Sequence, residues 1–291
     1  MSQKKLHKTL KQLNHLIRRA EALLPPAPPA ENLDDAVAFR WRRGNGRRWL
    51  EPINRPQRLG LKQLLCIDTQ KAELDRNTRQ FLAGAPANNA LLSGSRGTGK
   101  SSLIKALLTE HHGQGLRVVE VDRHDLIDLS EIIDRLQDRP EKYLLYCDDL
   151  SFEAGDPGYK ALKAVLDGSL VAPPDNVLIY ATSNRRHLLP EFLAENEQAH
   201  VVGTEIHHTE AVEEKISLSE RFGLWLSFWP FNQEQYLSIV DHWLEQLGLP
   251  DSNRRAARAE ALKWALARGS RSGRIAWQFA RDYAGRIQID A

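Results

Sequence analysis

"GSRGTGKSS", residues 94–102, lies between an apolar run and a helical pattern. Gly94 is followed by four residues and then by Gly99, Lys100 and Ser101, which is the spacing of a phosphate-binding loop. Its glycines let consecutive backbone N–H groups turn toward phosphates, and the dipole of the following helix favours the same anion. Such a spacing arises by chance in roughly one chain in a hundred, but chance matches seldom lie between a strand and a helix. The stretch therefore predicts a nucleotide-binding site.

The same spacing predicts which groups hold the nucleotide. Lys100 is expected to reach the β- and γ-phosphates, and the Ser101 hydroxyl is expected to ligate Mg²⁺. ATP and Mg²⁺ are thus the expected cofactors. The remaining residues of the loop are expected to surround the phosphates: Gly94, Ser95, Arg96, Gly97, Thr98, Gly99 and Ser102.

A second informative stretch is "LLYCDDLSF", residues 144–152, in which an apolar run ends in two adjacent aspartates. Buried strands rarely carry two carboxylates unless a positive charge is held there. Asp148 follows the run directly and is expected to hold Mg²⁺, either directly or through water.

The order of elements around these motifs predicts the fold class. Five apolar runs read as strands, and helical patterns separate most of them, which favours a parallel sheet covered on both faces. The prediction is an α/β P-loop NTPase αβα sandwich with a parallel five-stranded sheet. After Pro230, helical patterns near 233–247, 253–268 and 273–287 predict a small all-helical unit, with Asn232 and Ser252 as N-cap candidates.

The first 30 residues form a basic extension. Residues 1–24 carry six Lys or Arg and one acid, and their apolar residues recur at alternating steps of four and three. A helix with a narrow apolar seam is expected there, which either packs on its own domain or binds a partner. "PPAPPA" at 25–30 reads as a stiff linker.

Residues 39–49, "FRWRRGNGRRW", are expected to form a hairpin with a two-residue turn at Asn45 and Gly46. Five arginines lie between residues 40 and 48, interleaved with Trp41 and Trp49. Arginine and tryptophan together grip phosphates and stack on bases, so nucleic acid is one candidate partner. Exposed charge on an ordinary hairpin is the alternative.

Other features of the sequence set limits. Cys66 and Cys147 lie far apart, without metal or redox spacing, which is typical of a reducing cytoplasm. No apolar run approaches the ~18 residues that a membrane span needs. The basic N-terminus lacks the apolar stretch of a secretory signal. A cytoplasmic location without a transmembrane segment is expected.

Three further residues gain meaning from their order along the chain. Asn184 ends the apolar run "VLIYATS", Arg221 stands in "SERFG" before the last strand, and Arg274 opens the last helix. An amide at a strand end orients water without adding charge. Each residue alone reads as an ordinary turn or surface residue.

Together with the two earlier motifs, this ordered set resembles the AAA+ ATPases over residues 61–288. The resemblance implies Walker A at Lys100 and Ser101, and Walker B at Asp148 and Asp149. It also implies sensor 1 at Asn184, a trans-acting arginine finger at Arg221, sensor 2 at Arg274 with Arg271 as a weaker rival, and an adenine-side segment at Ile67 in "IDTQK". "PANNALL", "CDDLSF", "YATSNRRHL" and "SERFG" are similar to an uncharacterised bacterial family of predicted AAA+ ATPases. Some motifs also resemble those of replication initiators and helicase loaders.

The resemblance implies three units: an extension at 1–60, a nucleotide-binding domain at 61–230 and a lid at 231–291. Protein threading is disfavoured, since "DRHDLIDLSE" lacks the aromatic–apolar–glycine loop of many unfoldases. Asp149 replaces the usual glutamate, and the shorter side chain can cost ~10²-fold in rate. A neighbour's arginine can return ~10³–10⁵-fold.

Two functions are therefore expected from different classes. The first is an ATPase that works in a homo-oligomer, with Arg221 acting in trans, to remodel or load a macromolecular partner. The second is an ATP-dependent assembly switch with negligible turnover. A small-molecule kinase fits poorly, because the chain has a finger and a lid but no obvious acceptor pocket.

Overall fold

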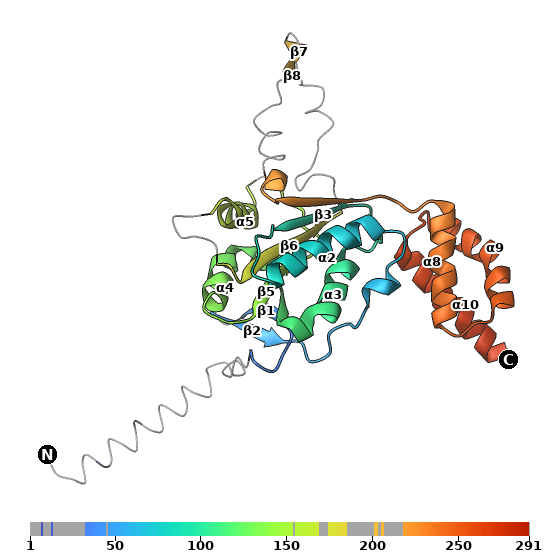
Figure 1. Ribbon diagram of the computed structural model, residues 1–291, viewed down its shortest axis with the longest axis horizontal. Helices are drawn as coiled ribbons and strands as arrows, with labels where there is room; N and C mark the ends of the chain where they lie inside the picture. Colours follow the sequence, from blue (N-terminus) through green and yellow to red (C-terminus); the bar gives the residue numbers. More distant parts are fainter. Residues whose placement is uncertain are drawn as a thin grey trace.

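Figure 1 shows a computed structural model of the chain. The structure describes residues 33–44, 46–153, 155–168, 174–184 and 218–290, together with His7, Leu13, Val201–Val202 (β7) and Glu205–Ile206 (β8). The predicted N-terminal helix and the Pro-rich linker lie outside these residues. Strands β7 and β8 pair with each other in an antiparallel ladder.

The main sheet has seven strands in the order β2-β1-β4-β5-β6-β3-β9. The five strands from β4 to β9 are mutually parallel, as predicted. The predicted strand number is nevertheless wrong for the whole sheet, because an N-terminal hairpin adds two strands beside β4. The parallel strands are β3 (Ala90–Gly94), β4 (Leu116–Glu120), β5 (Lys142–Cys147), β6 (Val177–Ser183) and β9 (Leu224–Phe228).

The hairpin consists of β1 (Ala38–Gly44) and β2 (Arg47–Pro52), which confirms the sequence prediction. Its register pairs Gly44 with Arg47, so two residues form the turn, and Gly46 has the positive φ of 71° that favours glycine. Strand β1 also pairs in parallel with β4. The attachment has a hydrophobic cause: Phe39, Trp41 and Leu50 are buried in the same core cluster as Val119.

Helices cover both faces of the sheet (Figure 1). One face carries α2 (Asp68–Leu82) and α3 (Lys100–His111), and the other carries η3 (Arg123–Asp128), α4 (Leu129–Leu136) and α5 (Pro157–Asp167). Short 3-10 turns lie at Leu61–Gln63 (η1) and His112–Gln114 (η2). Strand β5 is almost wholly buried, and its residues alternate between the two core clusters, as a strand covered on both faces must.

The C-terminal helices are α8 (Gln233–Gln246), α9 (Asp251–Ala267) and α10 (Gly273–Asp290). Asn232 caps α8, as predicted, and exchanges hydrogen bonds with Gln235 in a capping box. The N-cap prediction for Ser252 is wrong, because α9 begins at Asp251 and its N-cap is Pro250. Apolar residues of these helices share a core cluster with α2, α3 and β3. No helix in the described part of the chain has the length and hydropathy of a membrane span.

Candidate nucleotide-binding site

The segment between β3 and α3 forms a loop whose backbone only glycine tolerates at two critical places. Gly94 has φ 126°, and a Cβ there would lie 2.0 Å from the Phe228 carbonyl oxygen on β9. Gly97 has φ 72°, and a Cβ there would lie 2.8 Å from Ser272, just before α10. Both residues combine left-handed backbone with close approach, so the glycines of the motif have a steric reason as well as a chemical one.

Lys100 is the first residue of α3 and is 5% exposed. Its ammonium donates hydrogen bonds to the carbonyl oxygens of Gly94 (2.8 Å) and Ser95 (2.7 Å), and to Oδ1 of Asn184 (3.1 Å). Burial lowers the pKa of Lys100 to about 8; Asp149 and Asp148 oppose this shift, and Arg96 and Arg274 add to it. A buried cation whose closest partners are neutral oxygens is well suited to receive an anion.

Asp148 follows β5 and lies beside the start of α3. Its Oδ1 accepts hydrogen bonds from Ser101 Oγ (2.7 Å) and from Thr182 Oγ1 (2.6 Å). Desolvation acts to raise the pKa of Asp148, but the hydroxyls of Thr182, Ser101 and Tyr146 together with the charge of Lys105 outweigh it and hold the pKa below its ordinary value. The carboxylate is therefore ionised at neutral pH.

The donor set beside Asp148 fits Mg²⁺. This ion prefers oxygen ligands and commonly uses one or two carboxylates together with substrate phosphates. The Asp148 carboxylate and the Ser101 hydroxyl supply such oxygens at hydrogen-bond distance from each other. Among the described residues, no group of three or more His, Cys, Asp or Glu is arranged as a metal cluster.

Asp149 has a left-handed backbone, with φ 51°. Its N–H donates to Thr182 Oγ1 (2.9 Å), and its Oδ1 accepts from the amide of Asn184. The next residue, Leu150, donates its N–H to the carbonyl of Thr182 (2.7 Å). Sequence patterns do not reveal this turn of the chain, which changes the direction of the second carboxylate.

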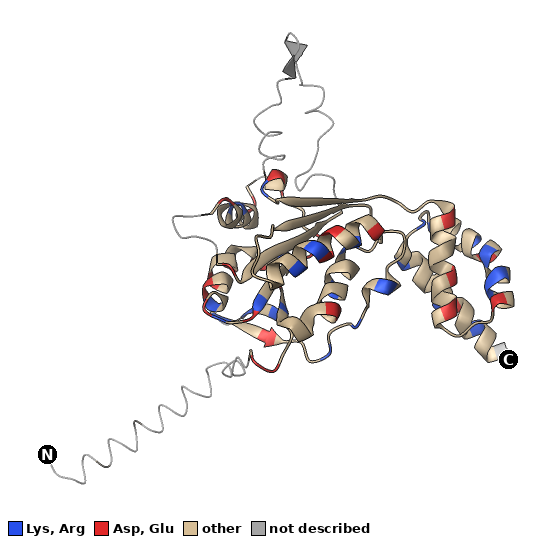
Figure 2. Cartoon of the chain, in the orientation of Figure 1, with Lys and Arg blue, Asp and Glu red and all other residues tan. Residues whose placement is uncertain are grey.

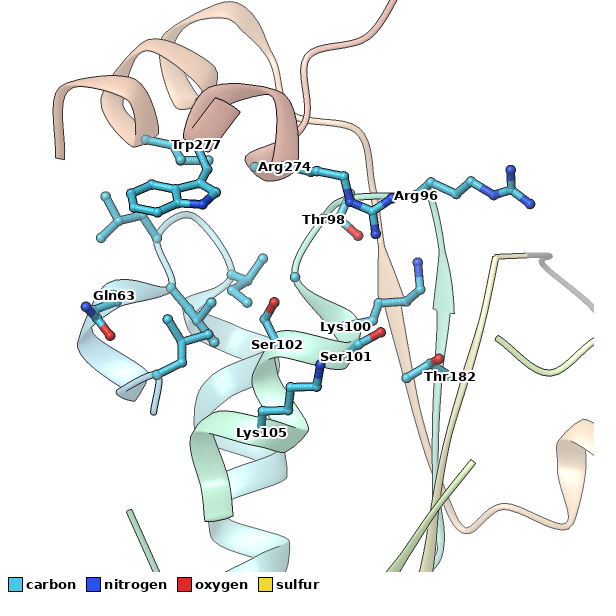
Figure 3. Close-up of a pocket in the computed structure, with 18 of the residues that line it drawn as sticks. Gln63, Arg96, Thr98, Lys100, Ser101, Ser102, Lys105, Thr182, Arg274 and Trp277 are labelled. Carbon is cyan, nitrogen blue, oxygen red and sulfur yellow. The ribbon is translucent and has the colours of Figure 1, made fainter. Parts of the chain in front are cut away.

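A pocket lies between the loop, the carboxyl ends of the strands and the C-terminal helices (Figure 3). Twelve of the residues predicted for the site line it: Ile67, Arg96, Gly97, Thr98, Gly99, Lys100, Ser101, Ser102, Asp148, Asp149, Asn184 and Arg274. Gly94 and Ser95 instead contact Lys100 through their carbonyls. Figure 3 shows Arg274 reaching from α10 over the loop toward Lys100.

Several lining residues were not predicted. Trp243 and Trp277 come from α8 and α10, with ring centroids 4.6 Å apart, and Trp277 faces the pocket in Figure 3. Thr182 and Lys105 also line it. The register of β6 carries a signal for Thr182, because residues two apart on a strand share a face and Asn184 was already a candidate. For Trp277, the sequence indicated only a partly core-facing position on the last helix.

Arg221 does not line this pocket. It lies just before β9 and forms an ion pair with Asp167 at the end of α5. Its assignment as a trans-acting arginine finger stays a prediction.

The C-terminal helices contact the loop directly. The Gly273 N–H donates to the Gly97 carbonyl (2.8 Å), and this bond joins the first residue of α10 to the centre of the loop. Arg274 follows immediately and lines the pocket. Arg271 is exposed and does not line it, so the geometry favours Arg274.

Most of the hairpin arginines are already paired within the chain. Their partners are Glu120 for Arg40 (2.6 Å), Glu51 for Arg42 (2.7 Å), Asp125 for Arg43 (3.7 Å), and Asp128 and Glu131 for Arg48 (3.0 and 2.9 Å). Figure 2 shows basic and acidic residues side by side in this region. Stacking of a base on Trp41 is ruled out, because this side chain is fully buried and donates its N–H to Asp128 (3.1 Å).

Residues 34–287 match the protein family described as "Protein of unknown function (DUF815)". No curated protein matches the chain significantly. Among solved structures, the Thermotoga maritima RuvB Holliday junction branch migration motor is similar, with 16% identity and a TM-score of 0.52 over 76% of this chain and 63% of that one.

A point mutant of the same RuvB gives 15% identity and a TM-score of 0.50, covering 77% of this chain and 65% of that one. A DNA replication initiation factor gives 16% identity and a lower TM-score of 0.45, covering 79% and 63%. The matched region thus spans less than two thirds of these RuvB chains. At this identity the likeness concerns the fold, which is that of the P-loop AAA+ ATPases.

Proposed function

The chain belongs to the family described as "Protein of unknown function (DUF815)", and we propose that it binds and hydrolyses ATP in an oligomer to remodel or load a macromolecular partner. The observation that carries the proposal is the ammonium of Lys100, buried among neutral oxygens beside the Ser101–Asp148 pair. Such a group is unfavourable without an anion and favourable with one. The AAA+ fold and the two pocket arginines, Arg96 and Arg274, support a triphosphate as that anion.

In this proposal each group has one task. Lys100 donates to the β- and γ-phosphates, and the loop backbone surrounds them. Ser101 and Asp148 hold Mg²⁺, which supplies charge neutralisation on the phosphates when bound. Asp149 accepts the proton of the attacking water, and Asn184 orients that carboxylate through its amide. Ile67, buried beside Gly99, supports the adenine side.

The lid and finger complete the proposed site. Arg274 adds positive charge from α10, and the residues 231–291 act as the lid of a nucleotide-binding unit at 61–230 that the hairpin extends. Arg221 is proposed to serve the pocket of a neighbouring copy. It does not line the pocket of its own chain, which supports this assignment. Because Asp149 has a shorter side chain than glutamate, turnover by a single copy is expected to be slow.

The test is ATP turnover at increasing protein concentration for the parent chain and for Lys100→Ala, Asp149→Asn and Arg221→Ala. Asparagine tolerates left-handed backbone as well as aspartate does, so Asp149→Asn removes the base without straining the turn. We expect specific activity to rise with concentration and all three variants to lose it. Mixing Arg221→Ala with Lys100→Ala should restore part of the activity, because each supplies what the other lacks.

The alternative is an ATP-dependent assembly switch. The exposed, left-handed Asp149 favours it, because a misplaced base slows hydrolysis without weakening ATP binding. Tight ATP binding with turnover no faster than that of Lys100→Ala, at every concentration, would establish the switch and reject the enzyme. Failure of the parent chain to bind ATP would reject both functions.

A further inference from the structure

Both aspartates of the pocket depend on one buried hydroxyl. Thr182 Oγ1 donates to Asp148 Oδ1 (2.6 Å) and accepts the N–H of Asp149 (2.9 Å). A hydroxyl has one proton and two lone pairs, so these two bonds are mutually compatible and fix its direction. Thr182 is 1% exposed, which keeps water from replacing either bond.

The backbone around Thr182 is fixed as well. Its carbonyl accepts the N–H of Leu150 (2.7 Å), and Ser183 Oγ donates to the Leu150 carbonyl (2.8 Å). Strand β6 therefore holds Leu150, the residue after Asp149, through two hydrogen bonds. Asp149 directly precedes Leu150 and has φ 51°, a conformation that is uncommon for L-residues and that Asp adopts more readily than most.

We propose that Thr182 is the positioning residue of this site: its hydroxyl directs the Asp148 carboxylate toward the metal and holds Asp149 in the left-handed turn. The inference rests on the proposed ATP site and names the group that couples its two carboxylates. Ser101 donates to the same Oδ1 from the other side. When the Ser101 oxygen is given to a metal, Thr182 remains the group that orients Asp148.

The proposal separates metal-dependent from metal-independent binding. ATP binding without metal depends on Lys100 and the loop; among the described residues, the Thr182 hydroxyl bonds only Asp148 and Asp149. Metal-dependent binding depends on Asp148, which Thr182 does contact. Loss of the hydroxyl should therefore change only the metal-dependent part.

The experiment uses the full chain and the variants Thr182→Val, which keeps the shape and removes the hydroxyl, and Thr182→Ser, which keeps the hydroxyl. The readout is the fluorescence of the tryptophans that line the pocket, Trp243 and Trp277. ATP is titrated once with a chelator present and once at stepped Mg²⁺ concentrations. Thr78→Val is the matched control, because Thr78 is equally buried and its hydroxyl bonds Leu74 and Tyr180 away from the pocket.

For Thr182→Val we expect the half-saturating Mg²⁺ concentration to rise roughly tenfold or more, the scale of losing an outer-shell partner of a metal ligand. Its metal-free ATP affinity should stay within about twofold of the parent. Turnover at saturating Mg²⁺ should fall as well, because Asp149 loses its turn. Thr182→Ser should behave as the parent, and Thr78→Val should change stability alone.

The inference is overturned if Thr182→Val keeps the Mg²⁺ dependence of the parent, or if metal-free and metal-dependent binding weaken together. If Thr182→Val does not fold, Thr182→Cys serves in its place, since a thiol of similar size is a weak donor. These outcomes differ from failure of the proposed function, in which the parent chain itself binds no ATP. In that case Thr182 would have no metal-dependent binding to support, and the inference would fall with it.

Discussion

The hairpin and the nucleotide pocket are both rich in cations but use them in opposite ways. Four of the five hairpin arginines have carboxylate partners on the same chain. In the pocket, Lys100 contacts neutral oxygens, and neither Arg96 nor Arg274 forms an ion pair within the described part of the chain. The sequence counts these charges alike. Their partners in the structure distinguish them: the hairpin arginines form ion pairs within the protein, whereas the pocket cations remain available to an anion.

The largest effect should come from the unpaired lysine. Lys100→Ala should lower ATP affinity by about 100-fold or more, because a truncated, desolvated charge contact costs several kcal/mol. The ligand-induced rise in Tm should disappear, while the free protein should unfold as cooperatively as the parent. Lys160→Ala changes an exposed lysine on α5 that does not line the pocket, and it controls for general loss of charge. Equal losses in both variants would contradict a special role for Lys100.

The next largest effect is expected at the ion pair between Arg48 of the hairpin and Asp128. Asp128 is 5% exposed and is shared by Arg48 and the Trp41 N–H. Arg48→Ala removes its charged partner and should reduce the free energy of unfolding by about 2 kcal/mol, because a buried carboxylate is left without an opposite charge. Denaturant unfolding measures the change. ATP affinity should stay unchanged. A loss of ATP affinity would contradict the separate roles of the hairpin and the pocket.

A smaller effect is expected at the lid. Arg274→Ala should weaken ATP binding roughly tenfold, the scale of one charge-assisted contact that remains partly solvated. Arg271→Ala, three residues earlier and outside the pocket, is the matched control and should bind ATP as the parent does. Isothermal titration distinguishes the two. A greater loss in Arg271→Ala would transfer the lid role to that residue.

The pH dependence of ATP binding should be smaller still. The folded pKa of Lys100 is lowered to about 8, and binding needs the protonated form. ATP affinity should therefore fall roughly fourfold between pH 7 and pH 8.5. The unfolded chain binds more protons than the folded one between about pH 8 and the ordinary range of lysine, so the stability of the nucleotide-free protein should rise with pH there. ATP affinity and the free energy of unfolding are measured over the same pH range. If both rise or both fall with pH, the prediction is wrong.

The smallest effect is expected at an exposed pair of the hairpin. Arg42 and Glu51 are 40% and 45% exposed, so Arg42→Ala should change stability by less than about 0.5 kcal/mol. Binding of a single-stranded oligonucleotide should be unaltered. A weaker affinity with a shallower salt dependence would instead show that the hairpin neutralises phosphates, despite its internal partners.

The sequence predicts well those parts of the fold that local patterns determine. The loop before α3, the five parallel strands and the cap at Asn232 follow from glycine spacing, apolar runs and the N-cap preference of asparagine. The attachment of the hairpin to β4 does not, because strand pairing between segments about 80 residues apart leaves no local periodicity. Ser252 was misplaced because Pro250 had already fixed the backbone for the helix start.

For the site, the sequence identified residues whose chemistry is explicit in a motif. It could not identify Trp277, whose contribution depends on where α10 lies relative to the loop, and its only signal for Thr182 was the strand face shared with Asn184. The left-handed backbone of Asp149 was likewise out of reach, because it arises from bonds to a strand some 30 residues away.

The hydrogen bond between Gly273 and Gly97 couples the loop mechanically to α10. Helix α10 has 18 residues and is about 27 Å long, so a load applied near its far end has a long arm. Tension on that end would pull at the carbonyl of Gly97, in the middle of the loop. If the loop holds a nucleotide as proposed, the lifetime of the bound nucleotide would then depend on the force applied to α10.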